Sequence, residues 1–185
     1  MLLCKSNLIN SQAFSSGIKQ FGVVGCGQMG TGIALVGGRQ AGYQVTILDQ
    51  TEERLGKSKE FMDKWLSLEI KKNRLTEDEK KEVMGRFSFT TRFEGLSQCD
   101  HVVEVVNENF QLKEQILQNL DKVLRPEATI SSNTSSISIT KMAALLKNPG
   151  RFMGTHFMNP VPKMKMLEII RGIQTSEETF SRIEE

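Results

Sequence analysis

The sequence predicts an α/β fold with a doubly wound, mostly parallel sheet and a helical hairpin inserted after the second strand. Short apolar runs alternate with segments of helical character, a pattern typical of parallel strands joined by crossover helices. A glycine-rich turn follows the first apolar run at residues 25–30, and a charged stretch without strand-like runs occupies residues 53–85. Together, the alternation, the turn and the charged insertion predict one sheet covered by helices on both faces.

The composition excludes several classes of protein. The chain has 185 residues, enough for one domain with a substantial core, and its 24 basic and 22 acidic residues give no excess of charge for binding nucleic acid. No apolar run approaches the roughly 20 residues that span a bilayer, so no membrane partner is expected. The cysteines, Cys4, Cys26 and Cys99, are odd in number and form no CxxC pair. We therefore expect neither a disulfide framework nor a metal site.

Residues 1–17 are predicted to be a leader preceding a domain that covers residues 18–185. This leader contains Lys5, several serines and no acidic residue, and the first acid in the chain is Asp49. An acid-free, serine-rich start favours a mitochondrial transit peptide, and hence the mitochondrial matrix. The absence of arginine leaves a plain disordered leader, and a cytoplasmic protein, as the alternative.

The first structural unit reads as strand, glycine turn, helix and strand. Residues 18–24 form a predicted buried strand that runs into a GxGxxG turn, and a helix-like run follows at residues 33–36. A second strand, residues 44–48, ends at Asp49, about 20 residues beyond the turn. This order is the fingerprint of a Rossmann-type dinucleotide site, whose turn comprises Gly25, Cys26, Gly27, Gln28, Met29 and Gly30.

Each element of this fingerprint has a physical role. Gly25 makes the tight turn, Gly27 lets a pyrophosphate approach the backbone, and Gly30 lets the helix pack against the strand. The carboxylate of Asp49 accepts ribose hydroxyls and repels a 2′-phosphate by about 1 to 4 kcal/mol at ~4 Å, which favours NAD over NADP. The alternative is a glycine turn followed by an incidental acid. The pair Gly37-Gly38, within the predicted helix, has no functional explanation at the sequence level.

The charged stretch is predicted to be a helical hairpin. A helix begins at Thr51, a basic turn follows at residues 71–74, and a capping box at Thr76–Glu79 opens the second helix. One interpretation is a basic clamp for a phosphorylated substrate. A solvated surface hairpin explains the same charges and is the interpretation that the sequence alone favours.

Further strands are predicted at residues 87–90, 99–106, 128–131 and 152–155, with helices at 111–123 and 139–146. Polar side chains follow two of these strands, where a doubly wound sheet binds its ligands: Glu104, Asn107, Glu108 and Asn109, and the hydroxyl-rich loop 131–136. Helix capping accounts for one or two of the loop hydroxyls and leaves the others free. His101 leads a strand and is interpreted as a strand-edge histidine, not a catalyst.

His156 and Glu168 are the candidate catalytic pair. His156 ends one apolar run, and Glu168 is the single carboxylate within the next run, residues 166–170, where we expect it to be buried. Strand pairing between these runs brings the two side chains together. A histidine held in one tautomer by a carboxylate is the minimum requirement for a general base.

Several segments together resemble the short-chain L-3-hydroxyacyl-CoA dehydrogenases, which include bacterial 3-hydroxybutyryl-CoA dehydrogenases. The resemblance covers residues 19–171 and is carried by GCGQMGTGIA, Asp49-Gln50, VVEVVNENFQLK, SNTSSISIT and GTHFMNPVPKMKMLEII. It implies NAD-dependent oxidation of an L-3-hydroxyacyl-CoA to the 3-ketoacyl-CoA, in β-oxidation or short-chain acyl-CoA metabolism. A different NAD-linked hydroxyacid dehydrogenase would share the glycine turn but not the HFMNPVP segment.

The resemblance also assigns roles to individual residues. His156 matches the catalytic base and Glu168 its acidic partner, while Ser135 and Asn159 match residues that contact substrate oxygen and nicotinamide. Cofactor contacts are implied for the glycine turn, Asp49, Gln50, Glu108 and Lys113, and a contact with CoA for Lys72 or Lys71.

The resemblance further implies a homodimer formed through a helical C-terminal domain, which does not follow within these 185 residues. Two hypotheses therefore remain. The chain carries the cofactor-binding half of a dehydrogenase, or it is a non-catalytic NAD-binding module without that second half.

Overall fold

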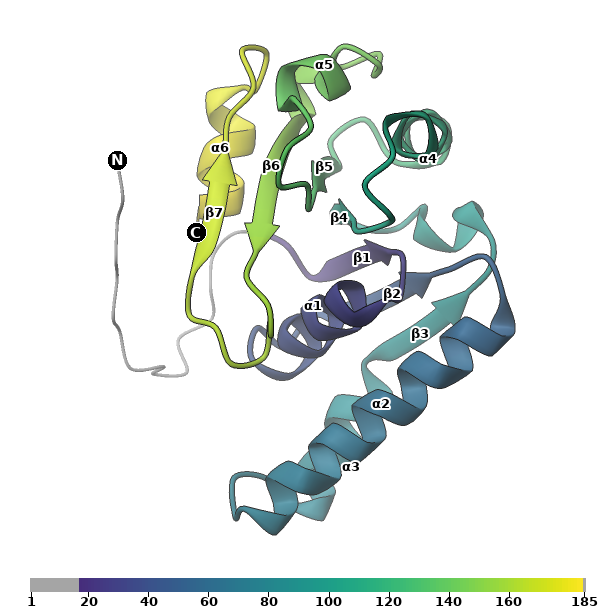
Figure 1. Cartoon of the computed structure of the whole chain (residues 1–185), viewed down its shortest axis with the longest axis vertical. Helices are drawn as coiled ribbons and strands as arrows, with labels where there is room; N and C mark the ends of the chain where they lie inside the picture. The colour runs from purple at the N-terminus through teal and green to yellow at the C-terminus, as the bar shows by residue number, and fades with distance from the viewer. Residues whose placement is uncertain (1–16, 185) are drawn as a thin grey trace.

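A seven-stranded sheet with the order β3-β2-β1-β4-β5-β6-β7 forms the centre of the structure (Figure 1). The computed structural model describes residues 17–184, so the predicted leader lies outside the described residues except for Gly17. The strands are β1 (Gln20–Val24), β2 (Gln44–Leu48), β3 (Phe87–Thr90), β4 (His101–Glu104), β5 (Thr129–Ser132), β6 (Phe152–Phe157) and β7 (Leu167–Ile170).

The first six strands are parallel, and β7 is antiparallel to β6. The predicted doubly wound, mostly parallel sheet is therefore confirmed. The antiparallel edge follows from the short connection at residues 158–166, because a parallel crossover needs about a dozen residues or more. The order of strands reverses between β1 and β4, which creates the switch point where such sheets bind ligands.

Helices cover both faces of the sheet (Figure 1). They are α1 (Gln28–Arg39), α2 (Glu52–Lys71), α3 (Glu77–Gly85), α4 (Phe110–Val123), α5 (Ile139–Ala143) and α6 (Glu177–Glu184), with 3-10 helices η1 (Phe93–Leu96) and η2 (Pro149–Arg151). α1 and α2 contribute to one buried apolar cluster and α4 and α5 to another. Within residues 17–184, no helix has the length and apolar character needed to cross a membrane.

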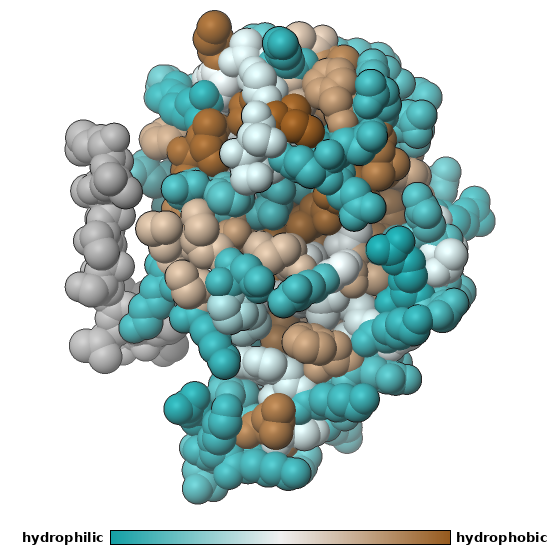
Figure 2. All heavy atoms as spheres, in the orientation of Figure 1, coloured by the Kyte–Doolittle hydropathy of each residue, from teal (hydrophilic) through white to brown (hydrophobic). Residues whose placement is uncertain are grey.

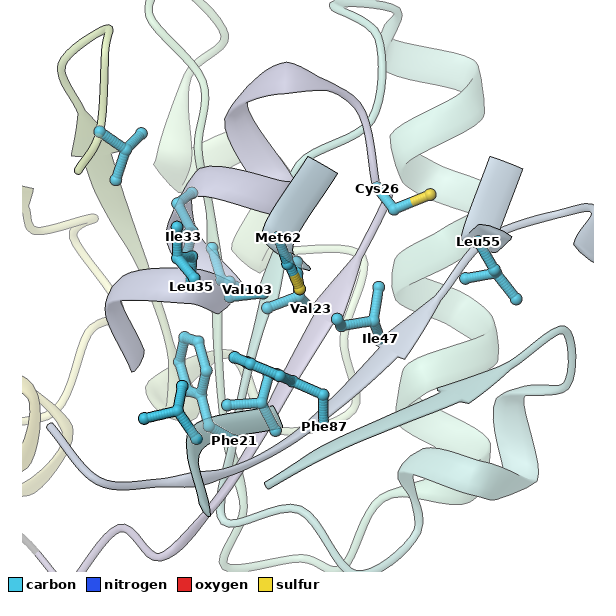
Figure 3. Packing of buried hydrophobic residues seen from close by; sticks show 14 of the residues in the cluster. Phe21, Val23, Cys26, Ile33, Leu35, Ile47, Leu55, Met62, Phe87 and Val103 are labelled. Carbon is cyan, nitrogen blue, oxygen red and sulfur yellow. The ribbon is translucent and has the colours of Figure 1, made fainter. Parts of the chain in front are cut away.

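The paired glycines of α1 are explained by close packing on the sheet. A Cβ added at Gly37 would lie 3.2 Å from the ring of Phe21, and one added at Gly38 would lie 2.6 Å from the ring of Phe87. Both rings belong to the cluster between α1 and the sheet, and Figure 3 shows them side by side there. The helix accepts the propensity cost of two glycines because larger residues would hold it away from these strands.

The predicted hairpin is confirmed as the pair α2–α3, which extends from the β3 edge of the sheet (Figure 1). Thr51 caps α2 by accepting a hydrogen bond from the backbone N–H of Arg54. Thr76 and Glu79 form the predicted capping box of α3. Figure 2 shows mostly hydrophilic side chains over the hairpin, whereas apolar patches gather on the upper half of the same view.

Candidate active site

The glycine turn joins the end of β1 to the start of α1. Gly25 has a φ of +100°, and a Cβ on Gly30 would lie 1.8 Å from the carbonyl oxygen of Gly25, so both positions require glycine. A Cβ on Gly27, in contrast, would meet no atom within 4 Å. Gly27 is also the N-cap of α1 and supplies no side-chain cap. The helix thus begins with free backbone amides next to open space, an arrangement suited to a pyrophosphate.

Asp49 lies at the end of β2 and faces the glycine turn. Its side chain is buried, and its carboxylate accepts hydrogen bonds from the backbone N–H groups of Cys26, at 2.8 Å, and Gln50, at 2.7 Å. The side chain of Cys26 is buried beside Asp49, and this burial, with a further contribution from Asp49, raises the pKa of its thiol to about 12. Cys26 is therefore a neutral packing residue, and its backbone contributes to the site.

A cavity of about 350 Å³ opens at the switch point. This volume is within the usual range for small-molecule sites. Its walls come from the ends of β1, β2 and β4 and from one side of α4, and they carry both apolar and polar side chains. The lining includes Gly27, Asp49, Gln50, Arg54, Phe93 and Ile116. A partly apolar slot beside a buried carboxylate and a glycine turn suits an adenosine group.

A buried ion pair joins the ends of β4 and β5 to α4. Lys113 and Glu104 are both fully buried, and the ammonium group of Lys113 lies 2.8 and 2.9 Å from the two carboxylate oxygens of Glu104. The hydroxyl of Ser132 donates to the same carboxylate at 2.6 Å. Sequence reasoning placed Glu104 at this edge but missed its pairing with Lys113. The signal was a single acid inside the apolar run VVEVV.

Glu108 lies above this ion pair and is held by the loop that follows β5. Lys113 is 3.5 Å away, and the hydroxyls of Thr134 and Ser136 donate hydrogen bonds to the Glu108 carboxylate. Burial acts to raise the pKa of Glu108, but the bond from Thr134 and the charge of Lys113 outweigh it and lower the pKa below its usual value. Ser135, between the two donors, is exposed. The predicted cofactor contacts Glu108 and Lys113 are thus linked, with Lys113 beneath Glu108.

The predicted catalytic pair forms across the antiparallel strands β6 and β7. Their register places His156 directly opposite Glu168, and Nδ1 of His156 lies 2.8 Å from the Glu168 carboxylate. With Nδ1–H donating to Glu168, Nε2 of the neutral ring is the proton acceptor. No other residue among 17–184 hydrogen-bonds to this ring. The expected burial of Glu168 is wrong: its side chain is 50% exposed, because β7 is an edge strand.

A loop brings the catalytic edge close to the glycine turn. Asn159 follows β6, and its side-chain oxygen accepts a hydrogen bond from the amide of Gln28 at 3.3 Å. A Cβ on Gly32 of α1 would lie 3.0 Å from Cβ of Val161, so this loop packs directly on the first turns of α1. Gln28 and Asn159, both predicted to be site residues, are therefore neighbours. Their contact was not predicted.

Lys71 and Lys72 are separate from this arrangement. They lie at the end of α2, and the ammonium group of Lys72 is 3.6 Å from the buried carboxylate of Glu69. Figure 1 shows this turn at the end of the hairpin that points away from the sheet. The predicted contact of either lysine with CoA remains a prediction.

The family model and the relatives that match this chain indicate the same family. The family model for the 3-hydroxyacyl-CoA dehydrogenase NAD binding domain matches residues 20–185. The chain is 46% identical over 160 residues to a probable 3-hydroxybutyryl-CoA dehydrogenase of Deinococcus radiodurans, which covers 86% of the chain and 57% of the relative. It is 38% identical over 173 residues to the mitochondrial hydroxyacyl-coenzyme A dehydrogenase of Rattus norvegicus, covering 90% of the chain and 54% of that protein.

Solved structures agree with these matches. The crystal structure of (S)-3-hydroxybutyryl-CoA dehydrogenase from Ralstonia eutropha superimposes with a TM-score of 0.88 at 40% sequence identity. That match covers 91% of the chain and 59% of the solved structure. The chain therefore spans somewhat more than half the length of the relatives that it matches.

Proposed function

The chain belongs to the 3-hydroxyacyl-CoA dehydrogenase family, of which it carries the NAD-binding domain, and from this premise we propose the reaction of the whole protein. The proposed reaction is the oxidation of an L-3-hydroxyacyl-CoA to the 3-ketoacyl-CoA. The observation that carries the proposal is the pairing of His156 with Glu168 at 2.8 Å. This pair lies at the carboxyl end of β6, on the same side of the sheet as the glycine turn at the carboxyl end of β1. A base with a free Nε2 next to a dinucleotide site is suited to removing a proton from an alcohol.

The residues around the switch point fit NAD. The free amides at the start of α1 are directed toward the position of a pyrophosphate, and the open space above Gly27 admits it. The carboxylate of Asp49 retains lone pairs for ribose hydroxyls, with Gln50 beside it, and the partly apolar cavity accepts the adenine. When bound, NAD supplies the acceptor for the hydrogen that leaves the substrate carbon.

In the proposed reaction, Nε2 of His156 takes the proton of the substrate C3 hydroxyl. Glu168 holds Nδ1–H, which keeps Nε2 unprotonated before the transfer and stabilises the imidazolium that forms afterwards. General-base catalysis of this kind contributes roughly 10²- to 10⁴-fold. The exposure of this pair leaves a substrate free access to Nε2.

The remaining predicted residues are proposed to orient the reactants. Asn159 is fixed by Gln28, and Ser135 lies between the two hydroxyls that bind Glu108, so each reaches the site from a tethered loop. Glu108 is the proposed polar contact for the nicotinamide end of the cofactor, and Lys113 acts by holding it. Lys72 or Lys71 is proposed to bind the phosphates of CoA.

We propose a homodimer for the complete protein. Met164, Met166 and Leu167 are exposed beside Glu168, and apolar side chains around a catalytic residue favour a covering surface.

A role in fatty-acid β-oxidation or short-chain acyl-CoA metabolism is also proposed. The proposed location is the mitochondrial matrix, which the name of the rat relative supports. Because other relatives are bacterial, a cytoplasmic location is the alternative. Organelle fractionation tests the location.

The test of the proposed function follows NADH consumption with acetoacetyl-CoA as the substrate for the reverse reaction. NADH binding is measured by fluorescence in the same samples, for the wild-type chain and His156→Ala. Turnover that is lost in the variant while NADH binding persists supports the dehydrogenase. NADH binding without turnover in the wild type supports the alternative, a cofactor-binding module. Absence of NADH binding contradicts the nucleotide site itself.

A further inference from the structure

Asn133 is the first residue after β5, and neither the fingerprint nor the family resemblance assigns it a role. Its side-chain oxygen accepts a hydrogen bond from the backbone N–H of Phe157 at 2.8 Å. Phe157 directly follows His156 in β6, so this bond holds the peptide group that joins the two residues. Asn133 therefore binds the backbone next to the proposed base, while the ring of His156 is bound by Glu168.

β6 extends beyond the end of its parallel neighbour β5. The register between these two strands ends at Gly154 of β6. On its other side, β6 continues to pair with β7, where His156 is opposite Glu168. The last residues of β6 thus pair with one strand only, and that strand is the edge of the sheet. On the β5 side, the carboxamide of Asn133 supplies the acceptor that a longer strand would have supplied.

The backbone of Asn133 is itself fixed at the centre of the sheet. Its N–H donates to the carbonyl oxygen of Glu104, the last residue of β4, at 2.8 Å. The side chain of Glu104 is fully buried and is held by Lys113 and Ser132. Because Asn133 has a short side chain on a fixed backbone, its oxygen is confined close to one position. Asn133 thus connects the rigid end of β4 to the end of β6.

The bond from Phe157 to Asn133 has limited value for the stability of the fold. Both residues are only partly buried, so water can replace the carboxamide when it is removed. Catalysis requires more accuracy than folding does, because a displacement of about 1 Å can lower a rate roughly 100-fold. A bond that matters little for the fold can therefore matter greatly for the position of His156.

We propose that Asn133 is a positioning residue that holds the His156–Phe157 peptide, and through it the imidazole of His156, in the geometry required for proton transfer. The inference rests on the proposed function, which gives His156 the role of base. Asn133 acts through the backbone of β6 and Glu168 acts through the ring, so the two residues restrain the base independently.

The test compares Asn133→Ala with Asn133→Asp and with the matched control Asn148→Ala. Alanine removes the acceptor, whereas aspartate keeps an oxygen that can accept the hydrogen bond from Phe157. Asn148 lies just before the opposite end of β6, where its side-chain oxygen accepts a hydrogen bond from the N–H of Gly150 at 3.2 Å. The control thus removes the same kind of bond from the other end of the same strand.

Steady-state turnover of NADH with acetoacetyl-CoA, NADH affinity and thermal unfolding are measured for each protein. Asn133→Ala should lower kcat about 10- to 100-fold, with KM within about threefold and NADH affinity within about twofold of the wild type. Asn133→Asp should recover kcat to within about fivefold of the wild type, and Asn148→Ala should stay within about twofold. The midpoint of thermal unfolding should fall by less than about 5 °C in all three variants.

Two NMR measurements report the same positioning without turnover. Hydrogen exchange at the amide of Phe157 should accelerate in Asn133→Ala, because this N–H loses its acceptor. Relaxation dispersion should detect added microsecond-to-millisecond motion at the backbone amide of His156 in the same variant. Asn148→Ala should change neither measurement.

Two results overturn the inference and leave the proposed function intact. One is a kcat of Asn133→Ala within about twofold of the wild type. The other is a loss of kcat matched by an equal loss of NADH affinity, which would assign Asn133 a structural role. If the wild type binds NADH without turnover, the proposed function fails and the NMR measurements decide the inference. Added motion at His156 in Asn133→Ala then supports it, and unchanged motion overturns it.

Discussion

The two histidines of the chain lie in opposite regions of the sheet and have opposite surroundings. His101 is at the start of the central strand β4, 4% exposed, and its ring nitrogens are 2.8 Å from the hydroxyl of Thr129 and 3.0 Å from that of Ser131. His156 is near the end of β6, 24% exposed at its side chain, with the carboxylate of Glu168 as its partner.

These surroundings determine what each ring can do. Burial, and to a lesser extent the charge of Arg182, lowers the pKa of His101 to about 3, so its ring is neutral at physiological pH and fully hydrogen-bonded. His156 has a carboxylate partner and one nitrogen left for a substrate. The partner and the accessibility of the ring, more than the residue type, therefore separate a structural histidine from a base.

The largest expected effect is on stability at acidic pH. The folded pKa of His101 is depressed below the ordinary value of 6.5, so the unfolded chain binds this proton first as the pH falls. The contribution of His101 is complete above about pH 6.5 and is lost progressively down to about pH 3, a total of about 5 kcal/mol. Urea unfolding across this range, for the wild type and His101→Asn, measures it. An equally steep acid loss in His101→Asn contradicts this assignment.

A second prediction concerns Lys113, whose partner Glu104 is fully buried, unlike the exposed partner of His156. Lys113→Met leaves the carboxylate of Glu104 without its cation, which should lower the free energy of unfolding by about 3 to 5 kcal/mol. The double variant Lys113→Met/Glu104→Gln removes the unpaired charge and should recover most of that loss. Urea unfolding measures both. Loss of less than about 1 kcal/mol in the single variant would show that this pair is solvated.

Glu168→Gln, in the edge strand β7, should lower turnover while leaving the free energy of unfolding nearly unchanged. The amide no longer stabilises an imidazolium, so turnover should fall about 10- to 100-fold in a preparation that is active with acetoacetyl-CoA. The unfolding free energy should change by less than about 1 kcal/mol, because the Glu168 side chain is half exposed. Steady-state kinetics and thermal unfolding provide the two readouts. Parallel losses in both would assign Glu168 a structural role.

Thr129→Val should act on stability alone. The substitution removes the hydroxyl 2.8 Å from Nδ1 of His101 and leaves that nitrogen without this partner in a buried site. The free energy of unfolding should fall by about 1 to 3 kcal/mol, as chemical denaturation would report, while NADH binding stays within about twofold of the wild type. Weakened NADH binding would instead connect this edge of the sheet with the cofactor site.

The sequence predicted the architecture well because the features that determine it are local. The GxGxxG turn, the capping box at Thr76 and the alternation of strands and helices are each visible in short windows of sequence. The pairing of His156 with Glu168 was also predicted, since it needs only two adjacent strands.

Features that depend on tertiary packing were missed. The reason for a glycine at position 38 is its close contact with the ring of Phe87, which is distant in sequence. The ion pair of Glu104 with Lys113 depends on how α4 packs against the sheet, and the exposure of Glu168 depends on β7 being an edge. Periodicity within one segment does not report which elements cover it.

The most direct test of the account is the tautomer of the two histidines, read from long-range ¹⁵N–¹H NMR spectra at about pH 8, where neutral rings are compared. We predict that His156 carries its proton on Nδ1 with Nε2 unprotonated, that Glu168→Gln weakens this preference, and that His101 is unaffected by the variant. A His156 ring protonated on Nε2 in the wild type would contradict the account, because that nitrogen could not accept the substrate proton.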